Sequence, residues 1–299
     1  MADREIRMEI ELPGPVDRAW RCFGEAEGLA NWYAPEAEVV PGEGGLIRTR
    51  WGEGFEFDER ILHWEPPYLM RTEGRRGSAK PTTLEIQLSE TVLGTRLQLV
   101  HGGIGRGEEW DAYLDNATRG WAYELRALRH YLANHYGVKR DFVFASRPAS
   151  LGAEKAWEVL GSSRGLGFLF LEDDLASGGK FDLRTPYGER ITGIVSILAP
   201  PKDFIGTWIA LDNAFFRWHV DESPDGVRVF CKANAYGVGE ERRVQIEREW
   251  GALLDRAFGG APRLEAAVAQ PPPVVARPQA LDLDEILGSL PPDSPETDF

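Results

Sequence analysis

Short motifs in the first half of this sequence recur in the same order in its second half. The spacing between matching motifs falls steadily from 137 to 129 residues, as small loop deletions would produce. Because the matches are collinear, they indicate a tandem duplication, and they restrict the chain to folds that one half can form alone. The matching pairs are Asp17–Trp20 with Glu154–Trp157, Gly24 with Gly161, Pro66-Pro67 with Pro200-Pro201, Gly94 with Gly226, Trp121 with Trp250, and Leu125 with Leu254.

The first copy begins with a strand and two short helices. Apolar residues alternate with polar ones over 6–12, which predicts a half-buried strand, and Pro13-Gly14-Pro15 ends it. Helices are expected at 16–23 and 26–32. Short runs rich in strand-forming residues then predict antiparallel strands at 37–40, 46–51, 55–64, 69–73, 82–90 and 95–100.

A long amphipathic helix closes each copy. In the first copy, apolar residues at three- and four-residue steps predict a helix over 108–135. The second copy repeats the order, with a strand at 142–145, a helix at 153–160 and a closing helix at 240–258. The pattern indicates an α+β protein in which each curved antiparallel sheet packs around a long C-terminal helix. Such a sheet often leaves a cavity between itself and the helix.

Composition excludes several classes of function. The chain has 299 residues and a formal net charge of −14, which argues against a general nucleic-acid binder. Its two cysteines, Cys22 and Cys231, lie far apart, so neither a disulfide scaffold nor a cysteine-rich zinc site is expected. We find no signal peptide and no apolar run that could span a membrane, and we expect a cytoplasmic protein.

Residues 261–299 differ from the rest of the chain. They contain eight prolines and a single aromatic residue, so we expect a disordered, proline-rich acidic tail. Within 281–290, four apolar residues follow helical spacing behind acidic residues, which is typical of a short amphipathic helix that could dock on a partner protein. A chance apolar cluster in a disordered tail explains the pattern equally well. The four residues are Leu283, Ile286, Leu287 and Leu290.

Four segments of the first copy resemble one protein family. They are Asp17–Trp20, Ile61–Thr72 (ILHWEPPYLMRT), Gly94–Gly103 (GTRLQLVHGG), and Gly120-Trp121 with Leu125 and Leu128. Together they are similar to the signatures of the bacterial relatives of the activator of the heat-shock-protein-90 ATPase. That family belongs to the SRPBCC/START superfamily, whose members include lipid carriers, polyketide cyclases and co-chaperone domains.

The resemblance implies a helix-grip fold that holds either a hydrophobic-ligand cavity or a partner-binding surface. The second copy is degenerate, because it keeps Pro200-Pro201 but has Ala233 where the first copy has His101. We therefore expect two tandem helix-grip domains, at 1–137 and 138–260, followed by the tail at 261–299. Fold alone does not decide between the functions of the superfamily.

Catalytic signatures find little support in the residues. No cluster has metal-ligand spacing, and His130 and His135 read as surface histidines near a helix end. His101 either orients a ligand in a cavity or is a strand residue with a satisfied hydrogen bond. A lone histidine does not define an active site, so we lean against an enzyme.

The sequence therefore predicts non-catalytic binding of a hydrophobic small molecule, a lipid or an aromatic metabolite, in the first domain. No cofactor and no metal are expected. The ligand-binding candidates are Trp32, Trp51, Phe57, His101 and Trp121, each of which could instead fill the core. One alternative is a co-chaperone-like interaction module that uses the tail. The other is a polyketide-cyclase-like enzyme, which would need a polar pair facing the cavity.

Overall fold

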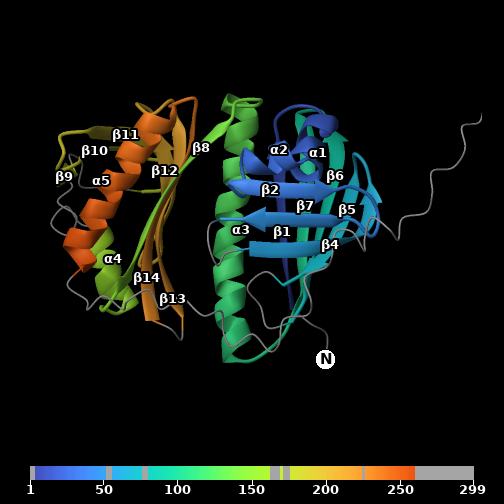
Figure 1. The fold of residues 1–299 in the computed structure, drawn as a ribbon, viewed down its shortest axis with the longest axis horizontal. Helices are drawn as coiled ribbons and strands as arrows, with labels where there is room; N and C mark the ends of the chain where they lie inside the picture. The colour runs from blue at the N-terminus through green and yellow to red at the C-terminus, as the bar shows by residue number, and fades with distance from the viewer. Residues whose placement is uncertain are drawn as a thin grey trace, which may run out of the picture.

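Two antiparallel sheets, each followed by a long helix, make up the protein (Figure 1). The computed structural model describes residues 4–51, 56–75, 80–161, 169–170, 176–223 and 226–259. The first domain comprises β1 (Arg4–Leu12), α1 (Val16–Gly24), α2 (Ala26–Ala30), β2 (Glu36–Val40), β3 (Leu46–Arg50), β4 (Glu56–Glu65), β5 (Leu69–Gly74), β6 (Thr82–Thr91), β7 (Gly94–Ile104) and α3 (Glu108–Asn134). The second comprises β8 (Arg140–Ala149), α4 (Ala153–Gly161), β9 (Leu169–Phe170), β10 (Lys180–Arg184), β11 (Arg190–Ala199), β12 (Asp203–Trp208), β13 (Ala214–Ser223), β14 (Gly226–Tyr236) and α5 (Glu240–Phe258).

Both sheets have seven strands and the same strand order. The first runs β1-β7-β6-β5-β4-β3-β2 and the second β8-β14-β13-β12-β11-β10-β9, so in each the opening strand pairs with the last one. This arrangement confirms the expected α+β class with two helix-grip domains. The strands and helices predicted from hydrophobic spacing form within a few residues of the expected positions. The proposed tail, including its 281–290 motif, lies outside the described residues.

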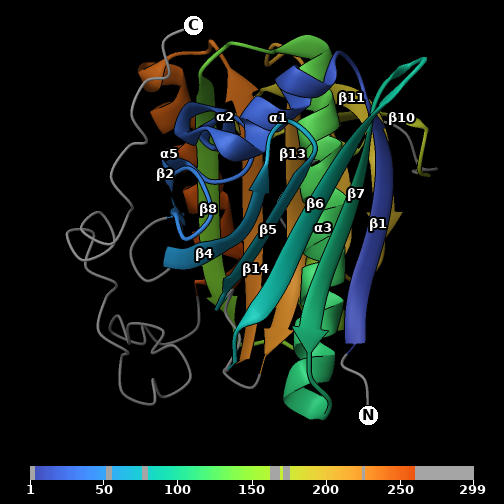
Figure 2. The same ribbon diagram turned by 90° about the vertical axis from the view of Figure 1, so that its right-hand side faces the viewer.

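The helix α3 lies between the two sheets, while α5 and α4 lie on the far side of the second sheet (Figures 1 and 2). One stripe of α3, which includes Trp121, Leu125 and Leu128, packs into the core of the first domain. These side chains follow the three- and four-residue spacing that the sequence predicts. Since β1 to β7 curve over this stripe, the first core is buried between its own sheet and α3.

A second stripe of α3 contacts the outer face of the second sheet. Tyr123 and Ala127 form a small buried cluster with Ile205 of β12 and Phe215 of β13. The rings of Tyr123 and Phe215 stack with centroids 5.5 Å apart. The closing helix of the first domain is therefore buried on two sides, by its own sheet and by its neighbour's.

Ion pairs surround this contact. Asp203 of β12 accepts hydrogen bonds from Arg217 of β13 at 2.7 Å and from Arg119 of α3 at 3.0 Å. Arg119 also donates to Asp221 at 2.8 Å. The side chains of Asp203 and Arg217 are only 4% and 6% exposed. Although burial acts to lower it, the carboxylates of Asp203 and Asp221 hold the pKa of Arg119 above its ordinary value.

His219 makes the stability of this contact depend on pH. It is buried, stacks on Phe230, and lies 3.5 Å from Asp221, yet burial lowers its pKa to about 4. The unfolded chain binds this proton below about pH 6.5. The stability that comes from keeping His219 neutral is therefore fully present above that pH, and it is lost as the pH falls toward 4. We expect His219 to lower the free energy of unfolding by about 2 kcal/mol between pH 7 and pH 5.

The variant His219→Gln checks this expectation, because glutamine does not titrate. Urea unfolding of both proteins at pH 7 and pH 5 gives the loss of stability over this interval. The loss should be smaller in the variant by about 2 kcal/mol. Equal losses in the two proteins would show that His219 is not the group responsible.

The sequence suggested that the two histidines at the end of α3 lie at the surface, but His135 is buried and His130 is partly buried. His135 is 5% exposed and stacks on Tyr236 of β14, with centroids 4.2 Å apart. His130 stacks on Phe215, and its Nε2 lies 2.6 Å from the carbonyl oxygen of Asn213. Sequence spacing places both near the helix end but carries no information on the second sheet that covers them.

Candidate functional site

A small cavity lies between the first sheet and α3. It encloses about 20 Å³, which is room for about one water molecule. Its wall combines residues of α1, of α2 and the segment after it, of β3 to β6 and of α3. The lining residues are Phe23, Leu29, Trp32, Tyr33, Ile47, Thr49, Glu59, Met70, Leu84 and Trp121.

Three aromatic rings form one side of the cavity. The ring of Tyr33 stacks on Trp121 with an interplanar angle of 2° and centroids 5.8 Å apart. Trp32 is 1% exposed, and its Nε1–H donates to the carbonyl oxygen of Cys22 at 2.8 Å. Trp51 and Phe57 lie farther out, where Trp51 contacts both Tyr33 and Phe57 edge to face. Partly exposed Tyr33 thus joins the cavity wall to an outer aromatic pair.

One carboxylate lines the cavity. Glu59 of β4 is 3% exposed and accepts a hydrogen bond from the Thr72 hydroxyl at 3.0 Å. It stands opposite Gly74 of β5, where an added Cβ would lie 2.7 Å from the Glu59 Cγ. Glycine at 74 therefore leaves the space that the inward carboxylate occupies. Thr49, also buried, adds a second polar side chain to the wall.

His101 lies behind the cavity wall. It is 1% exposed, and its Nδ1 accepts a hydrogen bond from the Trp121 Nε1–H at 3.0 Å. Because an indole nitrogen only donates, the proton of a neutral His101 is on Nε2. That nitrogen lies 3.0 Å from the Thr82 hydroxyl and 3.1 Å from the Tyr113 hydroxyl. This network fixes the orientation of Trp121.

The five residues selected from the sequence thus lie in three different places relative to the cavity. Trp32 and Trp121 line the cavity, Trp51 and Phe57 lie outside its lining, and His101 is packed behind Trp121. Tyr33 and Glu59, which also line the cavity, are not among these five residues. Glu59 had a usable signal, because it falls between Phe57 and Ile61 in the alternation of β4, at an inward position.

The groups around the cavity have little reactivity of their own. Burial raises the pKa of the Cys22 thiol to about 12, so this cysteine is not an activated nucleophile. In the described part of the chain, no three His, Cys, Asp or Glu residues are placed to hold a metal ion, and no helix is long and apolar enough to cross a membrane. An apolar wall that also carries a buried carboxylate and the Thr49 hydroxyl is suited to holding a small molecule in one orientation.

The equivalent region of the second domain is filled differently. Ala233 pairs with Phe216 as His101 pairs with Leu84, so alanine stands at the histidine position. Phe204, Phe216 and Trp218 contact one another in the core there, and Trp218 also contacts Trp250. The hydrogen bond that orients Trp121 in the first domain has no histidine to accept it in the second.

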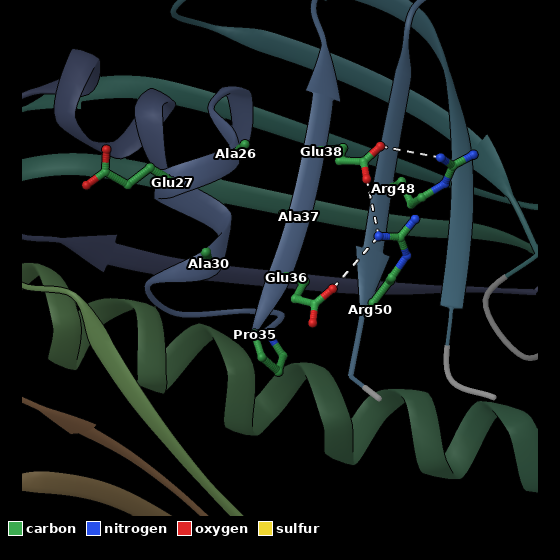
Figure 3. Close-up of a pocket in the computed structure, with 9 residues that line it drawn as sticks. All are labelled: Ala26, Glu27, Ala30, Pro35, Glu36, Ala37, Glu38, Arg48 and Arg50. Atoms are coloured by element: carbon green, nitrogen blue, oxygen red, sulfur yellow. Dashed lines mark hydrogen bonds and ion pairs between the residues drawn. The ribbon is translucent and has the colours of Figure 1, made fainter. Parts of the chain in front are cut away.

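Two larger hollows lie at the surface. One, of about 370 Å³, lies between α2, the edge strand β2 and its neighbour β3. Arg48 and Arg50 there are paired with Glu36 and Glu38 (Figure 3). The other, of about 590 Å³, lies beside Arg119 at the contact between the domains. The arginines of both hollows, and Lys202 in the second, are already bonded to carboxylates, so the described lining of neither hollow offers an unpaired cation to a ligand.

The model of one protein family matches residues 13–133. Its description is "Activator of Hsp90 ATPase homolog 1-like protein". No curated protein sequence matches the chain.

Similar solved structures include proteins of one and of two domains. DynU16, described as a putative protein in the dynemicin biosynthetic locus, is 16% identical with a TM-score of 0.41, and the match covers 85% of this chain and 96% of DynU16. The di-domain ARO/CYC protein BexL, from the BE-7585A biosynthetic pathway, is 14% identical with a TM-score of 0.39, covering 86% and 96%. The Aha1 dimer from Colwellia psychrerythraea is 16% identical with a TM-score of 0.39, covering 43% and 96%.

Proposed function

Residues 13–133 form a domain of the activator of Hsp90 ATPase homolog 1-like family, and from this premise we propose that the domain binds a small hydrophobic ligand without catalysis. The ligand is an aromatic molecule that carries a hydrogen-bond donor, such as a phenol. The observation that supports this proposal is the cavity wall, in which the carboxylate of Glu59 lies among apolar side chains that include Trp32, Trp121 and Met70. Apolar surface supplies the affinity, and the carboxylate selects the donor.

Ligand entry requires the wall to move, because the cavity holds only about 20 Å³. We propose that Tyr33 is the part that moves. It is partly exposed, whereas Trp32 and Trp121 are buried and held by hydrogen bonds to Cys22 and His101. Outward rotation of the Tyr33 ring, away from Trp121 and toward Trp51, would open the cavity while the rest of its wall stays in place.

The second domain acts as a structural partner in this proposal. We infer that residues 1–137 and 138–260 are duplicated units, since their sheets share one strand order. Ala233 at the histidine position is the sign that the second copy does not perform the role of the first. Its outer face instead covers α3 through Phe215 and Ile205.

Binding of naphthalene and 1-naphthol to the full chain tests the proposal. Both should quench tryptophan fluorescence saturably, and 1-naphthol should bind more tightly because its hydroxyl can donate to Glu59. A hydrogen bond to a charged group predicts a preference of about tenfold or more. Glu59→Gln should reduce that preference, and Thr49→Leu, which fills the cavity, should weaken both probes by about tenfold.

Glu65→Gln is the matched control, because Glu65 is an exposed carboxylate at the end of the same strand. It should leave both affinities unchanged. Circular dichroism and urea unfolding establish that each variant is folded. Absence of saturable binding by the wild-type protein would refute the proposed function. Binding of both probes with no response to Glu59→Gln would refute only the donor preference.

A further inference from the structure

Arg140, the first residue of β8, is a buried cation at the junction of the two domains. One of its terminal nitrogens donates to the carbonyl oxygen of Tyr33 at 3.3 Å and to the Asn234 Oδ1 at 3.1 Å. Its guanidinium carbon lies 4.9 Å from the centre of the Phe142 ring. Among the described residues, its Nε and its other terminal nitrogen have no hydrogen-bond partner. Burial lowers the pKa of this arginine.

Two side chains near Arg140, those of Asn234 and Tyr123, also have a buried polar atom without a hydrogen-bond partner among the described residues. Within the described part of the chain, neither the Asn234 Nδ2 nor the Tyr123 hydroxyl has a hydrogen-bond partner. Asn234 lies two residues after Lys232 on β14, so both face α3, and the Lys232 ammonium lies 4.1 Å from the Tyr123 ring. The orientation of Asn234 is fixed because its Oδ1 accepts from Arg140. The unpartnered atoms are therefore all able to donate.

The charges at this junction do not balance. Asp203 and Asp221 bind Arg119 and Arg217, and Glu124 binds Lys232 at 2.9 Å. Arg140 is the additional cation, because the carboxylate whose charge acts on it, Glu124, is already hydrogen-bonded to Lys232. A buried guanidinium that shares its counter-charge with a second cation is costly, and so are buried N–H groups without acceptors. An acceptor that carries one negative charge would remove both costs.

We propose that the domain junction binds one monovalent anion, a halide or a carboxylate as small as formate, between Arg140, Asn234 and Tyr123. The anion accepts from the Arg140 Nε and terminal nitrogen, from the Asn234 Nδ2 and from the Tyr123 hydroxyl. It neutralises the side chain that holds the Tyr33 carbonyl, and it thereby fixes the segment between α2 and β2 against the second domain. This site is separate from the cavity and does not depend on the proposed function.

Two measurements on the full-length wild-type protein test the site. Crystals grown in sodium bromide should show an anomalous peak within hydrogen-bond distance of Arg140. In solution, chloride, bromide or formate should stabilise the protein relative to gluconate at equal ionic strength, since gluconate is too large to enter. At a concentration ten times the dissociation constant, the unfolding equilibrium constant should fall about 11-fold. A response to halides but not to formate identifies the occupant as a halide.

Arg140→Met should abolish the dependence on the anion, because methionine keeps the length of the side chain without the charge. Arg147→Met is the control, since Arg147 lies on the same strand and pairs with Asp255 at the surface. That variant should keep the wild-type response. A water peak in place of bromide, together with equal stability in chloride and gluconate, would overturn the proposal. The wild-type data decide the matter even if Arg140→Met does not fold.

Discussion

Replacing Asp203 with alanine is expected to lower the free energy of unfolding by about 3–5 kcal/mol. Asp203 is the shared acceptor for Arg217 and Arg119, and its side chain is 4% exposed. Its removal leaves Arg217 buried without a carboxylate and deprives Arg119 of one of its partners. The cost comes mainly from these uncompensated cations and much less from the lost bonds. Chemical denaturation at pH 7 gives the change directly.

The neighbouring pair of Lys202 and Asp115 provides the control. Their charged groups are 2.7 Å apart, but the side chains are 44% and 47% exposed. Lys202→Ala should therefore cost less than about 1 kcal/mol. A similarly small effect of Asp203→Ala would contradict the view that desolvated charges hold α3 to the second sheet.

This contact shows why the arrangement of the two domains could not be predicted. The stripe of α3 that faces its own sheet is apolar at helical spacing, so the sequence predicts it directly. The other buried stripe includes Arg119, Tyr123 and Ala127, which are also spaced four residues apart. Because Arg119 is charged and Ala127 is small, this spacing does not stand out as an apolar pattern. The partners of this stripe lie 84 to 102 residues from Arg119 along the chain, on the face of a second sheet. Local hydrophobic spacing predicts helices and strands well, but it does not indicate which distant residue pairs with a charged side chain.

The candidate site was partly predictable for a similar reason. Aromatic residues stand out in composition, so Trp32 and Trp121 could be selected, but spacing did not separate them from Trp51, which lies farther out. Glu59 was overlooked because a charged residue in a strand normally faces solvent. Its inward direction depends on the register of β4 against β5, which also places Gly74 beneath it. Register of this kind is set by the sheet as a whole.

Replacing Trp121 with alanine is expected to destabilise the protein by about 3–5 kcal/mol, because the indole is buried between the first sheet and α3. The change also removes the hydrogen-bond donor to His101 and the ring against which Tyr33 stacks. Trp121→Phe separates these effects, since it keeps an aromatic ring without the N–H. We expect it to cost about 1–3 kcal/mol, the range for a buried acceptor that loses its donor.

A double-mutant cycle with His101→Leu measures the hydrogen bond itself. Once the acceptor is gone, Trp121→Phe should cost less by at least about 1 kcal/mol, because no buried nitrogen is left unpaired. Trp64→Phe, which alters a ring packed on Trp20, should be additive with His101→Leu. If the effects of Trp121→Phe and His101→Leu on stability add within about 0.5 kcal/mol, then His101 does not hold the indole. Coupling would instead establish His101 as a positioning residue, acting on any ligand only through the Trp121 face of the cavity.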